Sequence, residues 1–188
     1  MKTEPRDYSF QILYLINFTL LTVYTWGRWG HSFIDSYQAL YIFSALAKGN
    51  VLYLDVSYYF GPFAPYLHAF LFRLFGENLL WLYLIGLLNI LLVSWLLFLL
   101  ISSLANGKAA WTAVFIFLNI FAFNNIGWSG LFNYIRPYNY SSVYLVHFLL
   151  AASLFQIRTF RSASVSDAGA WSLMTAGVAL NRPDFAVF

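Results

Sequence analysis

The stretch from residue 79 to 104 limits the possible folds of this chain more than any other segment. It consists mainly of leucine, with isoleucine, valine, phenylalanine and tryptophan, and polar residues interrupt it only at Asn89 and at a few serines. An α-helix needs about 20 consecutive apolar residues to cross the roughly 30 Å hydrocarbon core of a bilayer. The segment exceeds that length, so it predicts a transmembrane helix.

The composition extends this expectation to the whole chain. Hydrophobic residues make up 61% of the 188 residues and charged residues only 9%, whereas soluble domains carry about 25% charged residues. A chain of this length cannot hide so much apolar surface in a soluble core. We therefore expect an all-α fold, a polytopic transmembrane helical bundle that forms a single membrane domain over residues 1–188. The net charge of +3 is small and scattered, which argues against nucleic acid as a partner.

Other apolar runs are also long enough to be spans when tilt is allowed for. The segment 62–75, PFAPYLHAFLFRLF, is different because it has about 14 residues and includes two prolines, His68 and Arg73. This length favours a re-entrant or interfacial helix. The expected spans are about 9–27, 79–104, 109–125, 141–157 and 170–188, and residues 28–78 form one long outer loop.

The basic residues indicate the orientation of the chain in the membrane. Lysines and arginines divide equally between the N-terminal side and the side of the outer loop. The loops on the N-terminal side are much shorter, so their density of basic residues is higher. We therefore place the N-terminus in the cytoplasm and expect an integral multi-pass protein in contact with membrane lipid.

Two isolated carboxylates, Asp35 and Asp55, lie in the outer loop. An ionisable residue at a membrane is a functional-site hypothesis by default. Each also has a structural interpretation, because Ser32 and Asp35 fit a capping box and Asp55 suits a solvated loop. The capping box predicts a helix of about 33–48, followed by an extended segment, VLYLDVSYYF, and by a turn at Gly61-Pro62.

The loop motifs follow one another in a distinctive order: Asp35, Gly49-Asn-Val-Leu-Tyr-Leu-Asp55, Gly61-Pro62-x-x-Pro65-Tyr66 and Leu74-Phe75-Gly76. This order resembles the first outer loop of the GT-C fold glycosyltransferases. That class includes the protein O-mannosyltransferases, the aminoarabinose transferases of lipid A and bacterial relatives of glycosyltransferase family 39. The segment Arg136-Pro-Tyr-Asn-Tyr-Ser-Ser-Val-Tyr144 also resembles a recurring element of the bacterial relatives.

The resemblance implies a membrane glycosyltransferase that moves a sugar from a polyprenyl-phosphate carrier to a glycan, lipid or protein acceptor. Transfer takes place on the periplasmic or lumenal face, and a bacterial inner membrane is the expected location. By position Asp35 is the acidic catalytic residue, with Asp55 as a second candidate. Many relatives carry a second acid where this chain has Ser36, so no cofactor is certain and a divalent metal stays open. Family members are usually more than twice as long, so we expect an N-terminal portion of a longer transferase.

Candidate substrate-binding residues lie on the same outer side. A leaving lipid phosphate is anionic and needs cations, and the planar fork of Arg136 suits phosphate. Sugars stack on aromatic faces, which tyrosines provide, although tyrosines also form interfacial belts. The Arg182-Pro183-Asp184 segment is either a site element or a local ion pair. The full set of candidates is Arg136, Tyr58, Tyr59, Arg28, Arg182 and Asp184.

The alternative function is that of a non-catalytic membrane protein, either a degenerate relative or a subunit that binds a lipid-linked glycan. A transporter is a weaker alternative, because it predicts paired broken helices in two halves and the sequence has no such symmetry. His68 has no neighbouring Cys or His and is expected at the interface rather than on a metal. No metal-ligating residue is assigned.

Overall fold

The computed structural model describes residues 8–28, 35–124, 133–137 and 139–185. In these ranges the chain is all-α, as expected, and contains no strand beyond one isolated bridge between Leu52 and Val56. The long helices are α1 (Ser9–Thr25), α4 (Leu79–Leu104), α5 (Gly107–Ile116), which continues as a π-helical segment (Phe117–Ala122), α6 (Tyr140–Ser162) and α7 (Val165–Asn181).

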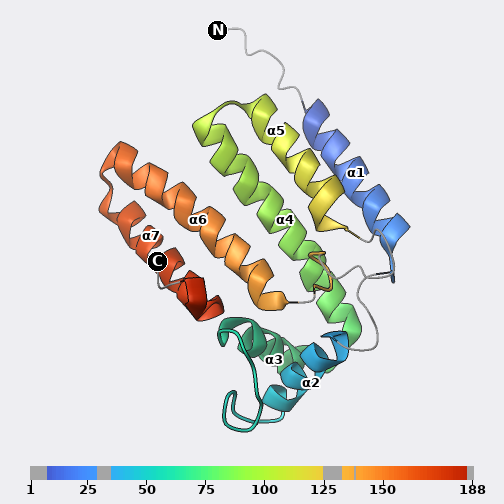
Figure 1. Cartoon of the computed structure of the whole chain (residues 1–188). Helices are drawn as coiled ribbons and strands as arrows, with labels where there is room; N and C mark the ends of the chain where they lie inside the picture. Colours follow the sequence, from blue (N-terminus) through green and yellow to red (C-terminus); the bar gives the residue numbers. More distant parts are fainter. Residues whose placement is uncertain (1–7, 29–34, 125–132, 138, 186–188) are drawn as a thin grey trace, which may run out of the picture.

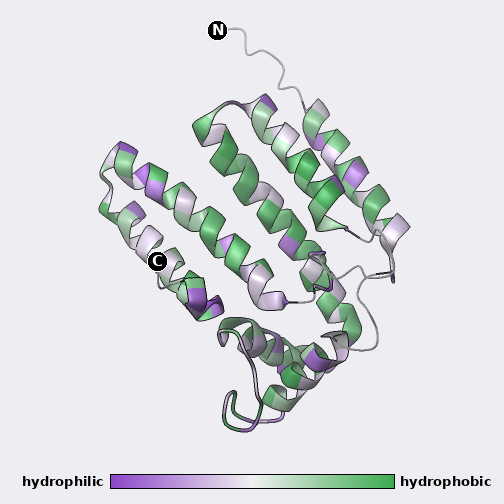
Figure 2. Ribbon diagram, in the orientation of Figure 1, coloured by the Kyte–Doolittle hydropathy of each residue, from purple (hydrophilic) through white to green (hydrophobic). Residues whose placement is uncertain are grey.

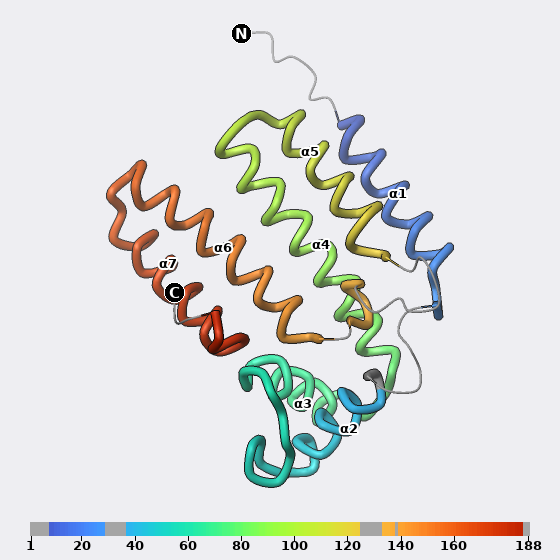
Figure 3. The backbone as a smooth tube through the Cα atoms, viewed as in Figure 1, coloured from blue at the N-terminus to red at the C-terminus, as the bar shows by residue number. Residues whose placement is uncertain are grey.

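These helices form one layer in the order α7, α6, α4, α5 and α1 (Figures 1 and 3). The two remaining α-helices, α2 (Asp35–Ala47) and α3 (Phe63–Phe75), pack against each other below one end of the layer. α3 also contacts α6 and α7. The pair therefore closes the end of the layer at which α6 begins and α7 finishes.

Asparagine and serine side chains start four of the helices. The Oδ1 atom of Asn78 accepts a hydrogen bond of 2.9 Å from the amide of Leu80 at the start of α4. Asn106, Asn139 and Ser164 accept equivalent bonds at the starts of α5, α6 and α7. Such caps satisfy amides that have no partner within a helix, so local sequence determines where these helices begin.

Two described helices, α4 and α6, are long and apolar enough to cross a membrane, with mean hydropathies of 2.7 and 1.4. Many leucines of α4 are exposed, and hydrophobic residues dominate α4 and α5 in Figure 2. Helices stand at all five expected positions, but α1 and α5 with its π-helical segment are shorter than a full span. α7 ends at Asn181, before Arg182 and Pro183, and does not reach 188. Two of the described helices therefore have the length and hydropathy of a membrane span, whereas five spans were expected.

The outer segment agrees with the sequence in its helices and differs in its loop. The expected 62–75 helix is present as α3, and α2 ends close to the expected position, while Ser32 of the capping box lies outside the described residues. The extended conformation expected for 51–60 is wrong at its centre, where Tyr53 has a positive φ of 70°. The reason is that the Asp55 carboxylate accepts a 2.7 Å bond from the Val51 amide and closes a tight turn.

Arg73 of α3 fixes α2 to α3 at their C-terminal ends. Its Nε and Nη2 atoms donate 2.8 Å hydrogen bonds to the carbonyls of Ala47 and Leu46. These carbonyls end α2, where partners within the helix are lacking and a positive charge is favourable. Lys48 and Glu77 add an exposed ion pair of 3.1 Å beside this contact.

Gly86 tests the packing of α4 against the 133–137 segment. A methyl group at this position would overlap the Cα atom of Ile135, whereas a methyl group on Gly169 of α7 would meet nothing within 4 Å. We expect Gly86→Ala to lower the free energy of unfolding by about 1–3 kcal/mol, because overpacking forces the backbone apart. Gly169→Ala should raise it by up to about 1 kcal/mol through helix propensity. Thermal unfolding of both variants in detergent checks this, and a Gly86→Ala variant as stable as the parent would contradict the packing.

Candidate functional site

His68 lies at the meeting point of α2, α3 and α6. Its side chain is fully buried, and its ring stacks on Phe43 of α2 with the centroids 4.5 Å apart. The ring of Tyr140 of α6 lies at a steep angle to it with the ring centroids 4.7 Å apart, and the Nε2 atom of His68 lies 3.1 Å from the hydroxyl of Tyr144. One side chain thus connects the α2–α3 pair to α6.

Burial lowers the pKa of His68 to about 3, so the ring is neutral near pH 7. Its Nδ1 atom has no hydrogen-bond partner in the described part of the chain. The ring is buried in the core between α2, α3 and α6. The described residues also contain no group of three or more His, Asp or Glu side chains that could hold a metal ion.

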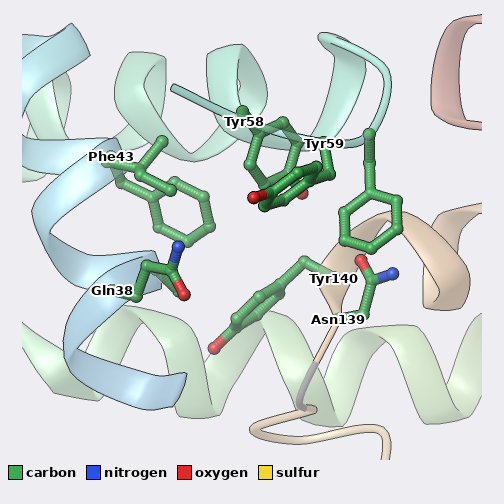
Figure 4. Close-up of a pocket in the computed structure, with 9 residues that line it drawn as sticks. Gln38, Phe43, Tyr58, Tyr59, Asn139 and Tyr140 are labelled. Atoms are coloured by element: carbon green, nitrogen blue, oxygen red, sulfur yellow. The ribbon is translucent and has the colours of Figure 1, made fainter. Parts of the chain in front are cut away.

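A pocket of about 140 Å³ opens beside this core (Figure 4). Figure 4 shows the rings of Tyr58 and Tyr59 on one side and the ring of Tyr140 on the other, with the side-chain amides of Gln38 and Asn139 at opposite edges. α2, the 58–60 segment and the start of α6 supply the lining. The lining residues are Gln38, Ala39, Ile42, Phe43, Tyr58, Tyr59, Phe60, Asn139 and Tyr140.

The end of α7 holds the segment 58–61 in place over the pocket. The Gly61 amide donates a 2.9 Å hydrogen bond to the Asn181 carbonyl, and any Cβ atom on Gly61 would overlap the Leu180 carbonyl. The Arg182 guanidinium lies 4.9 Å from the centre of the Phe60 ring. Position 61 therefore requires glycine, because the backbone there touches the backbone at the end of α7.

Tyr58 is fixed by a hydrogen bond between its hydroxyl and the Ser141 hydroxyl, with the oxygens 2.9 Å apart. Burial raises the pKa of Tyr58 to about 12, so the hydroxyl stays protonated at neutral pH. Tyr59, in contrast, is 92% exposed and presents its ring to solvent beside the pocket. The two adjacent tyrosines thus differ: Tyr58 anchors the segment to α6, and the ring of Tyr59 is exposed beside the pocket.

Arg182 and Asp184 pair with each other. Nη2 of Arg182 lies 2.6 Å from Oδ2 of Asp184, and Nη1 donates a 3.1 Å bond to Ser142 of α6. The guanidinium holds the pKa of the Asp184 carboxyl below its usual range. Of the two interpretations left open by the sequence, the local ion pair is present, and Arg182 also contacts the ring of Phe60, which lines the pocket.

The remaining candidates lie in separate places. Arg28 lies over the Tyr24 ring at the end of α1, and Asp55 lies in its turn and is not among the lining residues of the pocket. The Arg136 side chain is buried beside Tyr140, and its Nε atom has no partner among the described residues. Asp35 begins α2, and its side chain lies outside the part of the chain that the structure describes.

Sequence reasoning identified Tyr58 and Tyr59 but missed Gln38, Phe43 and Tyr140 as lining residues. Asn139 and Tyr140 fall inside the Arg136–Tyr144 segment that carries part of the family resemblance. That segment was therefore a usable signal. Gln38 offered none, because an amide in a helix has no special spacing, and only the packing of α2 places it across the pocket from Asn139.

Comparisons of the chain with protein-family models, with characterised proteins and with solved structures found no match. The resemblance to the GT-C glycosyltransferases therefore rests on the sequence motifs alone. The pocket is a separate observation, because its lining was defined by geometry and only partly overlaps the motif residues.

The neutral state of His68 predicts a pH-dependent stability. Its pKa is about 6.5 in an unfolded chain and about 3 in the folded one, so unfolding takes up a proton between these values. The free energy of unfolding is therefore unaffected by this titration well above pH 6.5. It falls as the pH falls, by about 2 kcal/mol at pH 5, because the unfolded chain binds the proton and the folded chain does not. We expect His68→Phe, which keeps the stacking on Phe43, to melt with a flatter pH dependence from pH 7.5 to 5. Parallel curves for the two proteins would contradict a buried neutral histidine.

Proposed function

We propose that this chain is the N-terminal membrane part of a GT-C type glycosyltransferase, which transfers a sugar from a polyprenyl phosphate to an acceptor on the outer face. The observation that carries the proposal is the pocket at the start of α2, with aromatic walls and amide edges. Aromatic faces and amides are the groups that bind sugar rings, since a ring offers both apolar C–H faces and hydroxyl groups.

The position of Asp35 supports its role as the acidic catalytic residue, which acts as the base for the acceptor hydroxyl. Asp35 is the first residue of α2, and the pocket residues Gln38 and Ala39 follow three and four positions later. Residues with this spacing share one face of a helix. Asp35 thus stands about one helical turn before the pocket residues of α2.

The proposed chemistry is a single displacement. The acceptor hydroxyl gives its proton to the Asp35 carboxylate as its oxygen bonds to the anomeric carbon. The bond from that carbon to the phosphate oxygen breaks, and polyprenyl phosphate leaves with the electron pair. The carboxylate also balances the positive charge that develops on the sugar. Arg136 is our candidate for stabilising the leaving phosphate, because its buried Nε atom has no partner among the described residues.

The proposed function also implies a placement of the helices in the membrane. α4 and α6 are the two helices that meet the length and hydropathy of a span, and we propose that α1, α5 and α7 cross beside them in a multi-pass arrangement. The exposed apolar side chains of α1 and α4 suit contact with lipid. The N-terminus would then be cytoplasmic, and α2, α3 and the pocket would lie at the outer surface of a bacterial inner membrane.

Replacing Asp35 tests the catalytic assignment. We expect Asp35→Asn to reduce sugar transfer by about 10²–10⁴-fold, the usual contribution of a positioned acid or base. The assay measures radiolabelled sugar moved from a polyprenyl-phosphate donor into envelope acceptors, in membranes that contain the whole protein. Asp167→Asn, at the α6–α7 connection, is the matched control and should transfer normally.

Unchanged transfer by the Asp35→Asn protein would overturn the catalytic role of this residue. A parent protein that binds the lipid-linked sugar and never transfers it would instead be the non-catalytic glycan-binding protein.

A further inference from the structure

Three basic residues lie at the end of the helical layer opposite α2 and α3. Lys108 is in the first turn of α5, and Arg158 and Arg161 are in the last two turns of α6. Figure 1 shows the start of α5 and the finish of α6 at this end of the layer. All three residues are exposed. We call the surface formed by Lys108, Arg158 and Arg161 the basic end.

The exposed cations at the two ends of the layer differ in their partners. Near α2 and α3, Lys48 pairs with Glu77 at 3.1 Å and Arg182 pairs with Asp184 at 2.6 Å. Within the described part of the chain, no cation of the basic end forms such an ion pair. The basic end therefore presents positive charge that the described residues do not neutralise.

The acidic residues near the basic end are too few to balance it. Asp167, in the first turn of α7, accepts a 3.3 Å hydrogen bond from the Ser162 hydroxyl. Residues 1–7, whose structure is not described, contain two basic and two acidic residues. They add no net side-chain charge, so this end keeps three basic residues against one acidic residue.

The helix that carries Lys108 does not explain its position. Lys108 is the second residue of α5, and a cation near a helix N-terminus is unfavourable because the positive end of the helix dipole lies there. Arg161, in contrast, suits the negative end of α6. An anion outside the chain would offset the unfavourable position of Lys108.

Exposed apolar and aromatic side chains accompany the cations. Phe160 is 77% exposed and Val165 is 86% exposed, on either side of the connection between α6 and α7. The rings of Phe10 and Trp111 stack beside Lys108 with their centroids 6.2 Å apart. Cations next to such side chains are typical of a surface on an anionic bilayer, where apolar groups enter the boundary below the phosphates.

The basic end also lies where the apolar length of the helices finishes. α4 and α6 are the two described helices with the length and hydropathy of a span. α4 ends at Leu104, shortly before Lys108, and the charged residues of α6 are confined to its last two turns. Positive charge therefore begins at the depth at which lipid headgroups replace acyl chains.

We propose that the basic end binds the headgroups of anionic phospholipids. The proposal rests on the membrane placement given for the proposed function and is independent of the catalysis. Lipid phosphates supply the counter-charge for Lys108, Arg158 and Arg161, while Phe160 and Val165 enter the boundary with the acyl chains. Each cation near an anionic bilayer strengthens binding by about fivefold, so the protein prefers anionic to zwitterionic lipid.

Native mass spectrometry of the whole protein measures this preference. The protein is released from micelles that contain equal amounts of phosphatidylglycerol and phosphatidylcholine with the same acyl chains. We expect the parent to retain at least about tenfold more phosphatidylglycerol, and Arg158→Gln/Arg161→Gln to lower this ratio at least about fivefold. Equal retention of the two lipids by the parent would overturn the proposal.

Two matched variants locate the binding. Arg28→Gln/Lys48→Gln removes the same charge near the other end of the layer and should keep the parent ratio. Arg158→Lys/Arg161→Lys keeps the charge of the basic end and should also keep the ratio. A ratio that falls in the Arg28→Gln/Lys48→Gln protein, or stays high in Arg158→Gln/Arg161→Gln, would show that the lipid binds elsewhere.

A spin label tests the contact with the bilayer separately. These 188 residues contain no cysteine, so a nitroxide on the Val165→Cys variant reports one position of this chain. In phosphatidylglycerol vesicles we expect its relaxation to respond more strongly to lipid-soluble oxygen than to a water-soluble nickel chelate. The reverse order would place position 165 in water and contradict the proposed contact.

The proposed lipid surface and the proposed catalysis fail in different ways. A protein that retains phosphatidylglycerol selectively and never transfers a sugar would overturn the catalysis and leave the lipid surface standing. A protein that transfers the sugar and retains both lipids equally would overturn the lipid surface and leave the catalysis standing.

Discussion

The burial of a neutral histidine between three helices is the contact on which the rest of the outer region depends. His68 brings Phe43 of α2 and Tyr140 of α6 to within about 5 Å of its ring, and both of those side chains are walls of the pocket. Burying an ionisable ring is tolerated because the ring stays uncharged and its Nε2 atom meets the Tyr144 hydroxyl. Phe43 and Tyr140 therefore both pack on His68 in the core and line the pocket.

Contacts with the end of α7 hold the remaining wall of the pocket in place. α7 finishes where its Asn181 carbonyl meets the Gly61 amide and where Arg182 covers Phe60. Residues 58–60 are thus held between α6 and α7, and they carry the tyrosines that face Tyr140. The result is a small pocket, lined by aromatic rings and side-chain amides among the described residues, at the end of an apolar helical layer.

The apolar runs and the caps made most of the helices predictable, because hydrophobic length and Asn or Ser caps are local signals. The 62–75 helix and the 79–104 helix appear almost as expected. The turn at Tyr53 was not predictable, since it depends on a hydrogen bond from the Val51 amide to the Asp55 carboxylate. The sequence predicted only some of the residues that line the pocket. Gln38 and Asn139 are about 100 residues apart in the chain, and long-range packing alone places them at the same pocket.

We propose that the sugar of a polyprenyl-phosphate donor lies between the 58–60 segment, α2 and the start of α6. A donor with a photoreactive diazirine on its sugar tests this directly, with the labelled peptides identified by mass spectrometry. The account predicts labels within 37–43, 58–60 or 139–141, removed by excess unmodified donor. Labels confined to the pocket at the start of α5, formed by Phe10, Lys108 and Trp111 among others, would contradict it.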